Sequence, residues 1–167
     1  MTKRPLSRFQ RLMQKIASSK PGAWIFARTQ HHLDRLVFKL SGGRTTMAGV
    51  LTGLPVVMLA NKGAKSGLIR TIPLLCIGDE ENPDNLILVA SNFGQRHNPA
   101  WYYNLRANPQ ANCTLYGITR TYRAREATGE DYERYWSHAL DVYMGFPRYK
   151  IRAGQRHIPI VVMEPVE

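Results

Sequence analysis

From residue 44 onward the chain is a series of short extended runs separated by tight turns, and this pattern limits the possible folds more than any other feature. The runs are rich in apolar and β-branched residues, and they are too short for ordinary helices. Helical patterns flank the runs rather than alternate with them, which favours antiparallel pairing over a doubly wound sheet. The sequence therefore predicts an α+β fold, a small barrel of mainly antiparallel strands with flanking helices. The predicted strands are residues 56–60, 68–77, 86–90, 111–116, 119–127 and 158–163.

The turn at residues 61–67 is the most distinctive of the connections. Gly63 and Gly67 bound it, and glycines let the backbone turn tightly with its amide groups exposed. Lys65 lies within the turn and Arg70 lies on the strand that follows, so two cations come to the same place. Such an arrangement suits phosphate or another anion. An ordinary exposed hairpin that carries two cations also explains the spacing.

The segment after the third predicted strand combines a loop with a short helix. Asn98 is expected to cap this helix, and Pro99 suits its first position, where a missing amide hydrogen costs nothing. Pro109 predicts that the helix has ended by residue 108. A helix N-terminus favours an anion, and Trp101 is expected either to form one wall for an aromatic ligand or to belong to the core. The loop at residues 91–97 leaves a sheet and enters a helix, which is a common position for ligands.

Two further signals mark the limits of elements. Pro73 lies inside the run 68–77, and it predicts an edge or a bulge there because proline cannot donate a ladder hydrogen bond. Thr128, followed by Asp131, predicts a capped helix start. That helix is expected to end near Gly145.

The formal net charge of the chain is +11, and the excess lies almost wholly in its first quarter. Residues 1–44 contain ten Lys and Arg against one acidic residue, whereas the remainder contains thirteen bases and eleven acids. We therefore divide the chain into a basic helical extension, residues 1–43, and a barrel domain, residues 44–167. The extension suits an anionic surface, or it is a solvated helix face that aids solubility.

Apolar residues in the extension repeat at helical spacing. Phe9, Leu12, Met13 and Ile16 predict a basic amphipathic helix that ends before residue 20. This stripe is expected either to pack against the sheet or to dock on a membrane surface or a partner. A second stripe at residues 33–40 is predicted to pack against the sheet.

Several classes of protein and site are disfavoured. No apolar run approaches the roughly 20 residues of a membrane span, and the N-terminus does not resemble a signal peptide. Cys76 and Cys113 are far apart, which predicts two reduced thiols in a cytoplasmic protein. The glycine motifs of nicotinamide and Walker sites are missing. We expect no metal site, because the adjacent His31 and His32 cannot face one ligand from a helix, and no specific nucleic acid.

Two segments together resemble the deazaflavin-dependent nitroreductase family, over about residues 57–165. The first runs from Gly63 through Lys65 and Arg70 to Leu74, and the second covers residues 98–109; Ser91 and residues 158–162 add to the likeness. The resemblance implies a split β-barrel like that of FMN-binding oxidases. It also implies hydride transfer from a reduced deazaflavin, coenzyme F-420, to a quinone, a nitroaromatic or another electrophilic small molecule.

The resemblance implies roles for particular residues as well. Lys65 and Arg70 would bind the phosphate and lactyl-glutamate tail of the cofactor, and a hydroxyl at the acceptor would donate a proton or bind the acceptor oxygen. The implied catalytic residues are Ser91, Tyr143 and Tyr149. The implied cofactor-binding residues are Gly63, Lys65, Ser66, Gly67, Arg70, Pro73, Ser91, Asn92, Gly94, Asn98, Trp101 and Asn104.

The chain also departs from the family pattern. Ala64 stands where the family commonly has a basic residue, and Asn92 and Phe93 stand where it commonly has Lys and Gly. FMN in the same fold is therefore an alternative cofactor. A further alternative is a non-catalytic basic module that binds a membrane surface through residues 1–44. The membrane contact itself is expected at residues 1–20. We expect a monomer or a homodimer, either free in the cytoplasm or peripheral at the inner face of the membrane.

Overall fold

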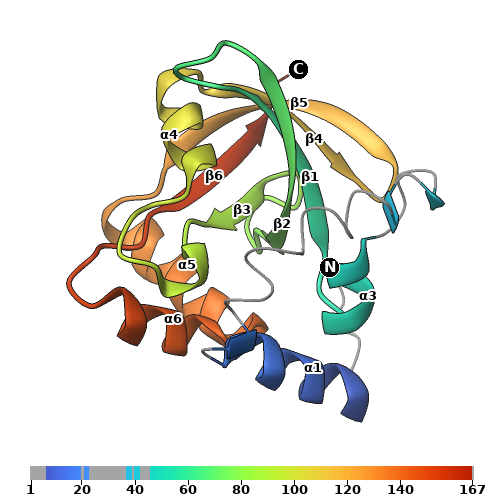
Figure 1. Ribbon diagram of the computed structural model, residues 1–167. Helices are drawn as coiled ribbons and strands as arrows, with labels where there is room; N and C mark the ends of the chain where they lie inside the picture. The colour runs from blue at the N-terminus through green and yellow to red at the C-terminus, as the bar shows by residue number, and fades with distance from the viewer. Residues whose placement is uncertain (1–6, 20, 23–36, 39, 42–45, 167) are drawn as a thin grey trace.

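The structure is a computed structural model that describes residues 7–19, 21–22, 37–38, 40–41 and 46–166 (Figure 1). The boundary expected at residue 43 lies outside these ranges, and so does most of the helical stripe expected at residues 33–40. The division of the chain into an extension and a barrel domain stays a prediction.

Six strands form a closed barrel, and every neighbouring pair is antiparallel. This confirms the fold class predicted from the extended runs. The order around the barrel is β1-β2-β3-β6-β5-β4. The strands are β1 (Val56–Lys62), β2 (Ile69–Gly78), β3 (Leu86–Val89), β4 (Gln110–Leu115), β5 (Ile118–Glu126) and β6 (Ile160–Pro165).

The long strand β2 changes partners along its length, and Pro73 lies where it has one partner. Residues 69–75 pair with β1, whereas only residues 76–78 pair with β3. Within the part of the chain that the structure describes, the side of Pro73 away from β1 therefore has no strand beside it. The expected edge is confirmed, and a proline is tolerated there because no ladder hydrogen bond is lost on the open side.

Helices cover one end and one side of the barrel (Figure 1). The α-helices are α1 (Arg8–Ser18), α3 (Met47–Thr52), α4 (Ala100–Ala107), α5 (Gly129–Val142) and α6 (Phe146–Ala153), and η1 (Asn92–Gly94) is a single 3₁₀ turn. Helix α6 was not predicted, because Gly145 and Pro147 suggest the end of the preceding helix rather than the start of another. Proline is nevertheless compatible with a first helical turn, and the helix buries Phe146, Tyr149 and Ala153 at helical spacing.

Two predicted helix caps are wrong in detail. Helix α4 begins at Ala100 with Pro99 in the cap position, and the Asn98 side chain instead accepts a hydrogen bond from Arg156. Thr128 does precede α5, but its side chain makes no capping hydrogen bond. The Asp131 carboxylate pairs with Arg125 and Arg134 rather than completing a capping box. Asn98 is therefore bound by a distant arginine, whereas Asp131 is paired with arginines nearby in the sequence.

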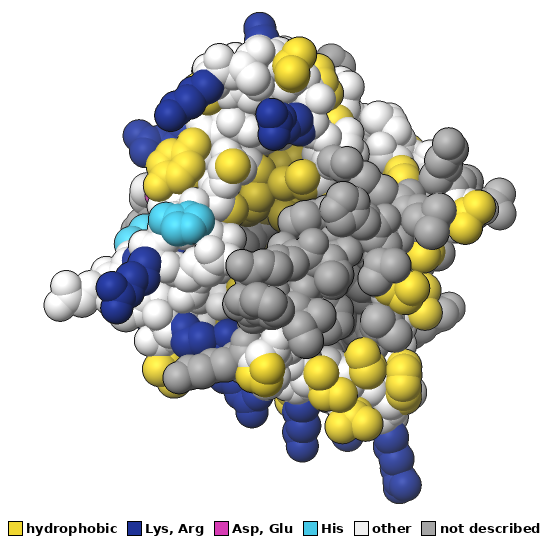
Figure 2. All heavy atoms as spheres, viewed as in Figure 1, with side chains coloured by type: hydrophobic (Ala, Val, Ile, Leu, Met, Phe, Trp, Pro, Cys, Tyr) yellow, Lys and Arg dark blue, Asp and Glu magenta, His cyan; other side chains and the backbone are white. Residues whose placement is uncertain are grey.

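The apolar residues of α1 face away from the protein. Phe9, Leu12 and Ile16 are 57%, 54% and 45% exposed, whereas the polar Gln14 and Ser18 are buried. Figure 2 shows hydrophobic side chains gathered at the lower edge, where α1 lies in Figure 1, with Lys and Arg side chains projecting beside them. This apolar stripe therefore does not pack against the sheet. No described helix is long and apolar enough to span a membrane.

A buried carboxylate joins the turn after β2 to helix α5. Asp79, 7% exposed, accepts hydrogen bonds from the Asn85 amide (3.0 Å), the Tyr135 hydroxyl (2.8 Å) and the backbone amide of Glu81 (3.1 Å). Burial alone would raise the pKa of the Asp79 carboxyl, but these hydrogen bonds outweigh burial and hold that pKa below its ordinary value. The charged form of Asp79 therefore stabilises the folded state.

We predict that Asp79→Asn lowers the free energy of unfolding by about 2 kcal/mol at pH 7, since it removes charge-assisted hydrogen bonds. The contribution of Asp79 is fully present above its unfolded-state pKa of about 4, and it is lost as pH falls through the lower folded-state pKa. Urea denaturation should therefore show the wild-type advantage shrinking below about pH 4. The control is Asp84→Asn, which breaks an exposed ion pair with Arg120 and should cost less than about 1 kcal/mol. A difference that stays constant with pH would contradict the prediction.

Candidate functional site

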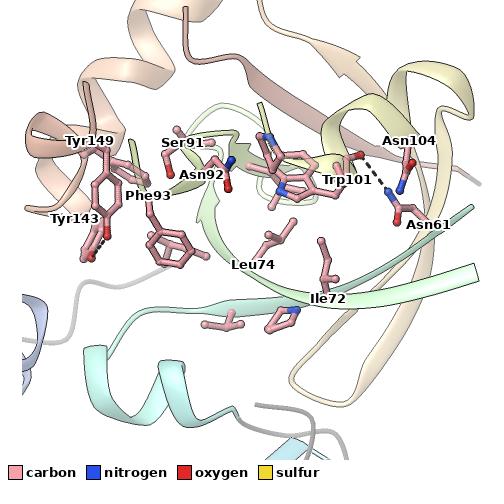
Figure 3. Close-up of a pocket in the computed structure, with 18 of the residues that line it drawn as sticks. Asn61, Ile72, Leu74, Ser91, Asn92, Phe93, Trp101, Asn104, Tyr143 and Tyr149 are labelled. Atoms are coloured by element: carbon pink, nitrogen blue, oxygen red, sulfur yellow. Dashed lines mark hydrogen bonds between the residues drawn. The ribbon is translucent and has the colours of Figure 1, made fainter. Parts of the chain in front are cut away.

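A cavity of about 440 Å³ opens beside the free edge of β2. Its walls come from β1, β2, β3, the loop that follows β3, and helices α4 and α6 (Figure 3). This volume is within the range of small-molecule and cofactor sites. The lining residues are Leu54, Val56, Asn61, Arg70, Ile72, Pro73, Leu74, Leu75, Leu88, Val89, Ser91, Asn92, Phe93, His97, Pro99, Ala100, Trp101, Asn104, Tyr143, Phe146 and Tyr149.

The two ends of the cavity differ in chemistry. Figure 3 shows Tyr143, Tyr149 and Phe93 at one end, and Asn61 and Asn104 at the other. Apolar side chains of β2 and the ring of Trp101 lie between them. A flat aromatic ligand with one polar extension would match this distribution of side chains.

Two tyrosines that are hydrogen-bonded to each other lie at the aromatic end. Tyr143 follows α5, Tyr149 lies on α6, and their hydroxyl oxygens are 3.0 Å apart. Both side chains are buried, and this burial raises the pKa of each hydroxyl, so both remain O–H groups at neutral pH. Gly145 is required for this packing, because a Cβ atom there would lie 2.3 Å from the Tyr143 ring.

At the polar end, two asparagines join β1 and its turn to helix α4. The buried Asn61 amide donates to the carbonyl oxygen of Trp101 at 3.1 Å, and the Asn104 side-chain oxygen accepts from the Ala64 amide at 3.0 Å. Each bond links residues forty positions apart in sequence. Asn61 was not predicted as a site residue, because the sequence pattern assigns it to the turn at residues 61–67, whereas the structure places it on β1.

The turn between β1 and β2 has the tight geometry expected from its glycines. Gly67 has φ +68°, and a Cβ atom at Gly63 would lie 2.5 Å from the Ser66 hydroxyl oxygen. Lys65 is exposed on the turn, and Arg70 is exposed at the margin of the cavity. Neither side chain forms an ion pair with any residue that the structure describes. Two uncompensated cations therefore stand beside the polar end.

The loop after β3 contains an unusual run of left-handed backbone. Asn92, Phe93 and Gly94 have φ values of +47°, +55° and +78°. This conformation costs about 1–2 kcal/mol for a residue with a side chain. Gly94 has a further reason to be glycine, because a Cβ atom there would lie 2.8 Å from the carbonyl oxygen of Tyr149. The loop consequently packs directly against α6.

Arg156 holds this loop in place, although it lies about sixty residues away in sequence. Its guanidinium donates to the carbonyl oxygens of Ala90 (3.2 Å), Ser91 (2.7 Å) and Gln95 (2.8 Å), and to the Asn98 side chain. Burial lowers the pKa of Arg156 from its ordinary value. Sequence reasoning missed this residue, since no local pattern marks an arginine whose partners are backbone carbonyls.

The structure brings together most, but not all, of the residues predicted for the site. Eight of them line the cavity: Arg70, Pro73, Ser91, Asn92, Trp101, Asn104, Tyr143 and Tyr149. The other six lie beside it. Gly63, Lys65, Ser66 and Gly67 form the adjoining turn, Gly94 packs against α6, and Asn98 binds Arg156. Phe146 and His97 also line the cavity and were not predicted.

Comparisons of the sequence with known proteins all lead to the same family. The profile of the F420H(2)-dependent quinone reductase family matches residues 30–165 of this chain. A Mycobacterium tuberculosis protein that carries the family's name, Rv3178, is 34% identical over 118 residues, which covers 71% of this chain and 96% of Rv3178. F420H(2)-dependent quinone reductase Rv1261c of the same species is 31% identical over 114 residues, covering 65% of this chain and 72% of Rv1261c.

Solved structures are similar over the same region. A structure described as the F420-H2 dependent reductase FDR-A has a TM-score of 0.59 at 32% identity, covering 66% of this chain and 94% of that protein. A second structure, described as a domain-swapped dimer, has a TM-score of 0.61 at 27% identity and covers 87% of this chain and 100% of its own.

We predict that Arg156→Met destabilises the protein by about 2 kcal/mol and loosens the loop, because several carbonyl groups lose a charged donor. Hydrogen exchange at the Gly94 and Gln95 amides should become faster, since both amides are bonded within the loop. Arg123→Met, at an exposed position on β5, is the matched control and should leave exchange in this loop unchanged. Equal exchange rates in both variants would show that Arg156 does not hold the loop.

Proposed function

Because the chain belongs to the F420H(2)-dependent quinone reductase family, it is a deazaflavin-dependent oxidoreductase, and we propose that its cavity is where a hydride passes from reduced coenzyme F-420 to a quinone. The resemblance found in the sequence is thereby confirmed at the level of family, fold and cofactor. The observation that supports this use of the cavity is its division into an aromatic end and a polar end flanked by two uncompensated cations.

The residues present fit the cofactor. A deazaflavin has a flat aromatic ring system, and the middle of the cavity offers Trp101 and the apolar side chains of β2 for its faces. Its tail carries a phosphate and carboxylates, and Arg70 and Lys65 lie beside the polar end. Ala64 removes one family cation from this region, so Arg70 and Lys65 carry a larger share of the attraction.

Reduced F-420, when bound, supplies a hydride, and a quinone needs one hydride and one proton to become a hydroquinone. The protein has to hold the acceptor, keep water out and provide a hydrogen-bond donor to the acceptor oxygen. Tyr143 and Tyr149 suit this last role because their raised pKa values keep both as O–H groups. The Ser91 hydroxyl also lines the cavity and is a second candidate donor. No covalent nucleophile is required.

We predict that Lys65→Ala and Arg70→Ala each raise the dissociation constant for coenzyme F-420 about tenfold or more, because a charge-assisted contact with the anionic tail is lost. Fluorescence titration of the purified variants measures this directly. Arg123→Ala removes the same charge from β5, outside the cavity, and should change the constant by less than about twofold.

The same titration with FMN separates the two cofactors. Tight FMN binding without F-420 binding would contradict the proposal in favour of the alternative cofactor. Equal losses in all three variants would mean that the effect is one of net charge rather than of a tail site.

We also propose that α1 places the protein on the cytoplasmic face of a membrane, where lipid-soluble quinones reside. The exposed side chains of Phe9, Leu12 and Ile16 form an apolar stripe on α1, beside the exposed Arg8, Arg11 and Lys15. Such a helix lies in the plane of an anionic bilayer surface, with its apolar stripe inserted. Helix α1 also contacts α6, which forms part of the aromatic end of the cavity. We call this the acceptor end, because the quinone would bind there.

We predict that Leu12→Glu reduces co-sedimentation with vesicles of phosphatidylcholine and 30% phosphatidylglycerol at least about fivefold, because a charge replaces an inserted apolar group. Leu68→Glu makes the same change at an exposed residue of the β1–β2 turn and serves as the control. Sedimentation that is equal for Leu12→Glu and the wild type would rule out this use of α1.

A further inference from the structure

Phe93 is the residue of the cavity whose backbone conformation least suits its side chain. Its φ and ψ are +55° and +20°, in the left-handed region that glycine adopts most easily. Backbone of this kind persists only where the surroundings hold it, and it concentrates at functional sites. An aromatic residue at this position costs backbone strain, so we expect its side chain to have a function.

Several contacts fix the position of the Phe93 ring. The backbone carbonyl oxygen of Phe93 accepts a hydrogen bond from the Arg152 guanidinium at 3.4 Å, and the next residue, Gly94, lies tightly against α6. The ring itself meets the Tyr149 ring edge-on, with centroids 6.0 Å apart and planes at 70°. Arg152 also lies over the Tyr149 ring, 5.0 Å from its centroid. The ring is held from the backbone side and from the side of α6.

Phe93 packs at the margin of a buried cluster and is not inside it. Phe93 is only half-buried, whereas Phe146 and Tyr149 beside it are 3% exposed. Figure 3 shows the Phe93 ring between the tyrosine pair and the middle of the cavity. The ring thus occupies space next to the two hydroxyls that an acceptor would approach.

We propose that Phe93 is a specificity-determining residue, whose ring narrows the acceptor end of the cavity and selects small quinones over bulky ones. This inference rests on the proposed function. Removing the ring opens the space beside Tyr143 and Tyr149, and a larger acceptor then gains access. Discrimination by a change of this size in an apolar pocket amounts to about 10-fold or more in kcat/KM.

The test compares Phe93→Gly with Tyr116→Gly. Tyr116 is also a non-glycine residue with positive φ, +52°, but it lies in the β4–β5 turn and does not line the cavity. The measured quantity is the ratio of kcat/KM for menadione to kcat/KM for 1,4-benzoquinone, with reduced F-420 as the donor. Phe93→Gly should raise this ratio about tenfold, and Tyr116→Gly should leave it within about twofold.

A second variant and a binding measurement keep the outcome decisive. Phe93→Leu retains an apolar side chain and should shift the ratio in the same direction, by less. Calorimetry of menadione with the cofactor-free protein should show tighter binding to Phe93→Gly than to the wild type.

The inference is overturned if the ratio and the menadione affinity of Phe93→Gly both match those of the wild type. A wild-type protein that oxidises reduced F-420 with neither quinone would contradict the proposed function instead. The calorimetric comparison would then still decide whether Phe93 limits the size of the ligand.

Discussion

The open edge of β2 is the constraint on which the rest of the site depends. Among the strands that the structure describes, residues 69–75 have β1 on one side, and β3 joins the other side only at residues 76–78. In a fully paired barrel, the faces of neighbouring strands would meet and side chains would fill the interior. Here the unpaired stretch provides an apolar wall, and α4, α6 and the loop after β3 close around it to leave a cavity. Pro73 is compatible with this position because no strand on the open side requires a hydrogen bond from its backbone nitrogen.

Arginines from the C-terminal part of the chain then fix the shape of that cavity. Arg156 donates hydrogen bonds to the carbonyl groups of Ala90, Ser91 and Gln95, and Arg152 donates one to the carbonyl of Phe93. Backbone carbonyls in a loop have no regular partner of their own, and leaving them unpaired near the core is costly. A delocalised guanidinium with five donors can serve several of them at once. The loop therefore takes its conformation from distant side chains rather than from its own sequence.

This difference explains what the sequence could and could not predict. The strands, the tight turn between Gly63 and Gly67, and the place of Arg70 on the strand that follows it come from local patterns and were predicted correctly. Asn98 is a good cap by its chemistry, yet a long-range partner, Arg156, takes its side chain. The left-handed turn at Asn92 and Phe93 depends on tertiary contacts that no periodicity reveals. Helix α6 was missed because Gly145 and Pro147 conceal its helical spacing. The strands and the turn beside the cavity were therefore easier to predict than the side chains that hold the loop.

Arg152 makes the first helix and the cavity wall parts of one unit. The same guanidinium donates to the carbonyl of Ser18, in the last turn of α1, and to the carbonyl of Phe93. A ligand or surface that repositioned α1 would therefore act on the same side chain that supports the Phe93 carbonyl. Any coupling between binding at α1 and binding at the aromatic end of the cavity would be reciprocal, each event changing the affinity of the other by the same factor.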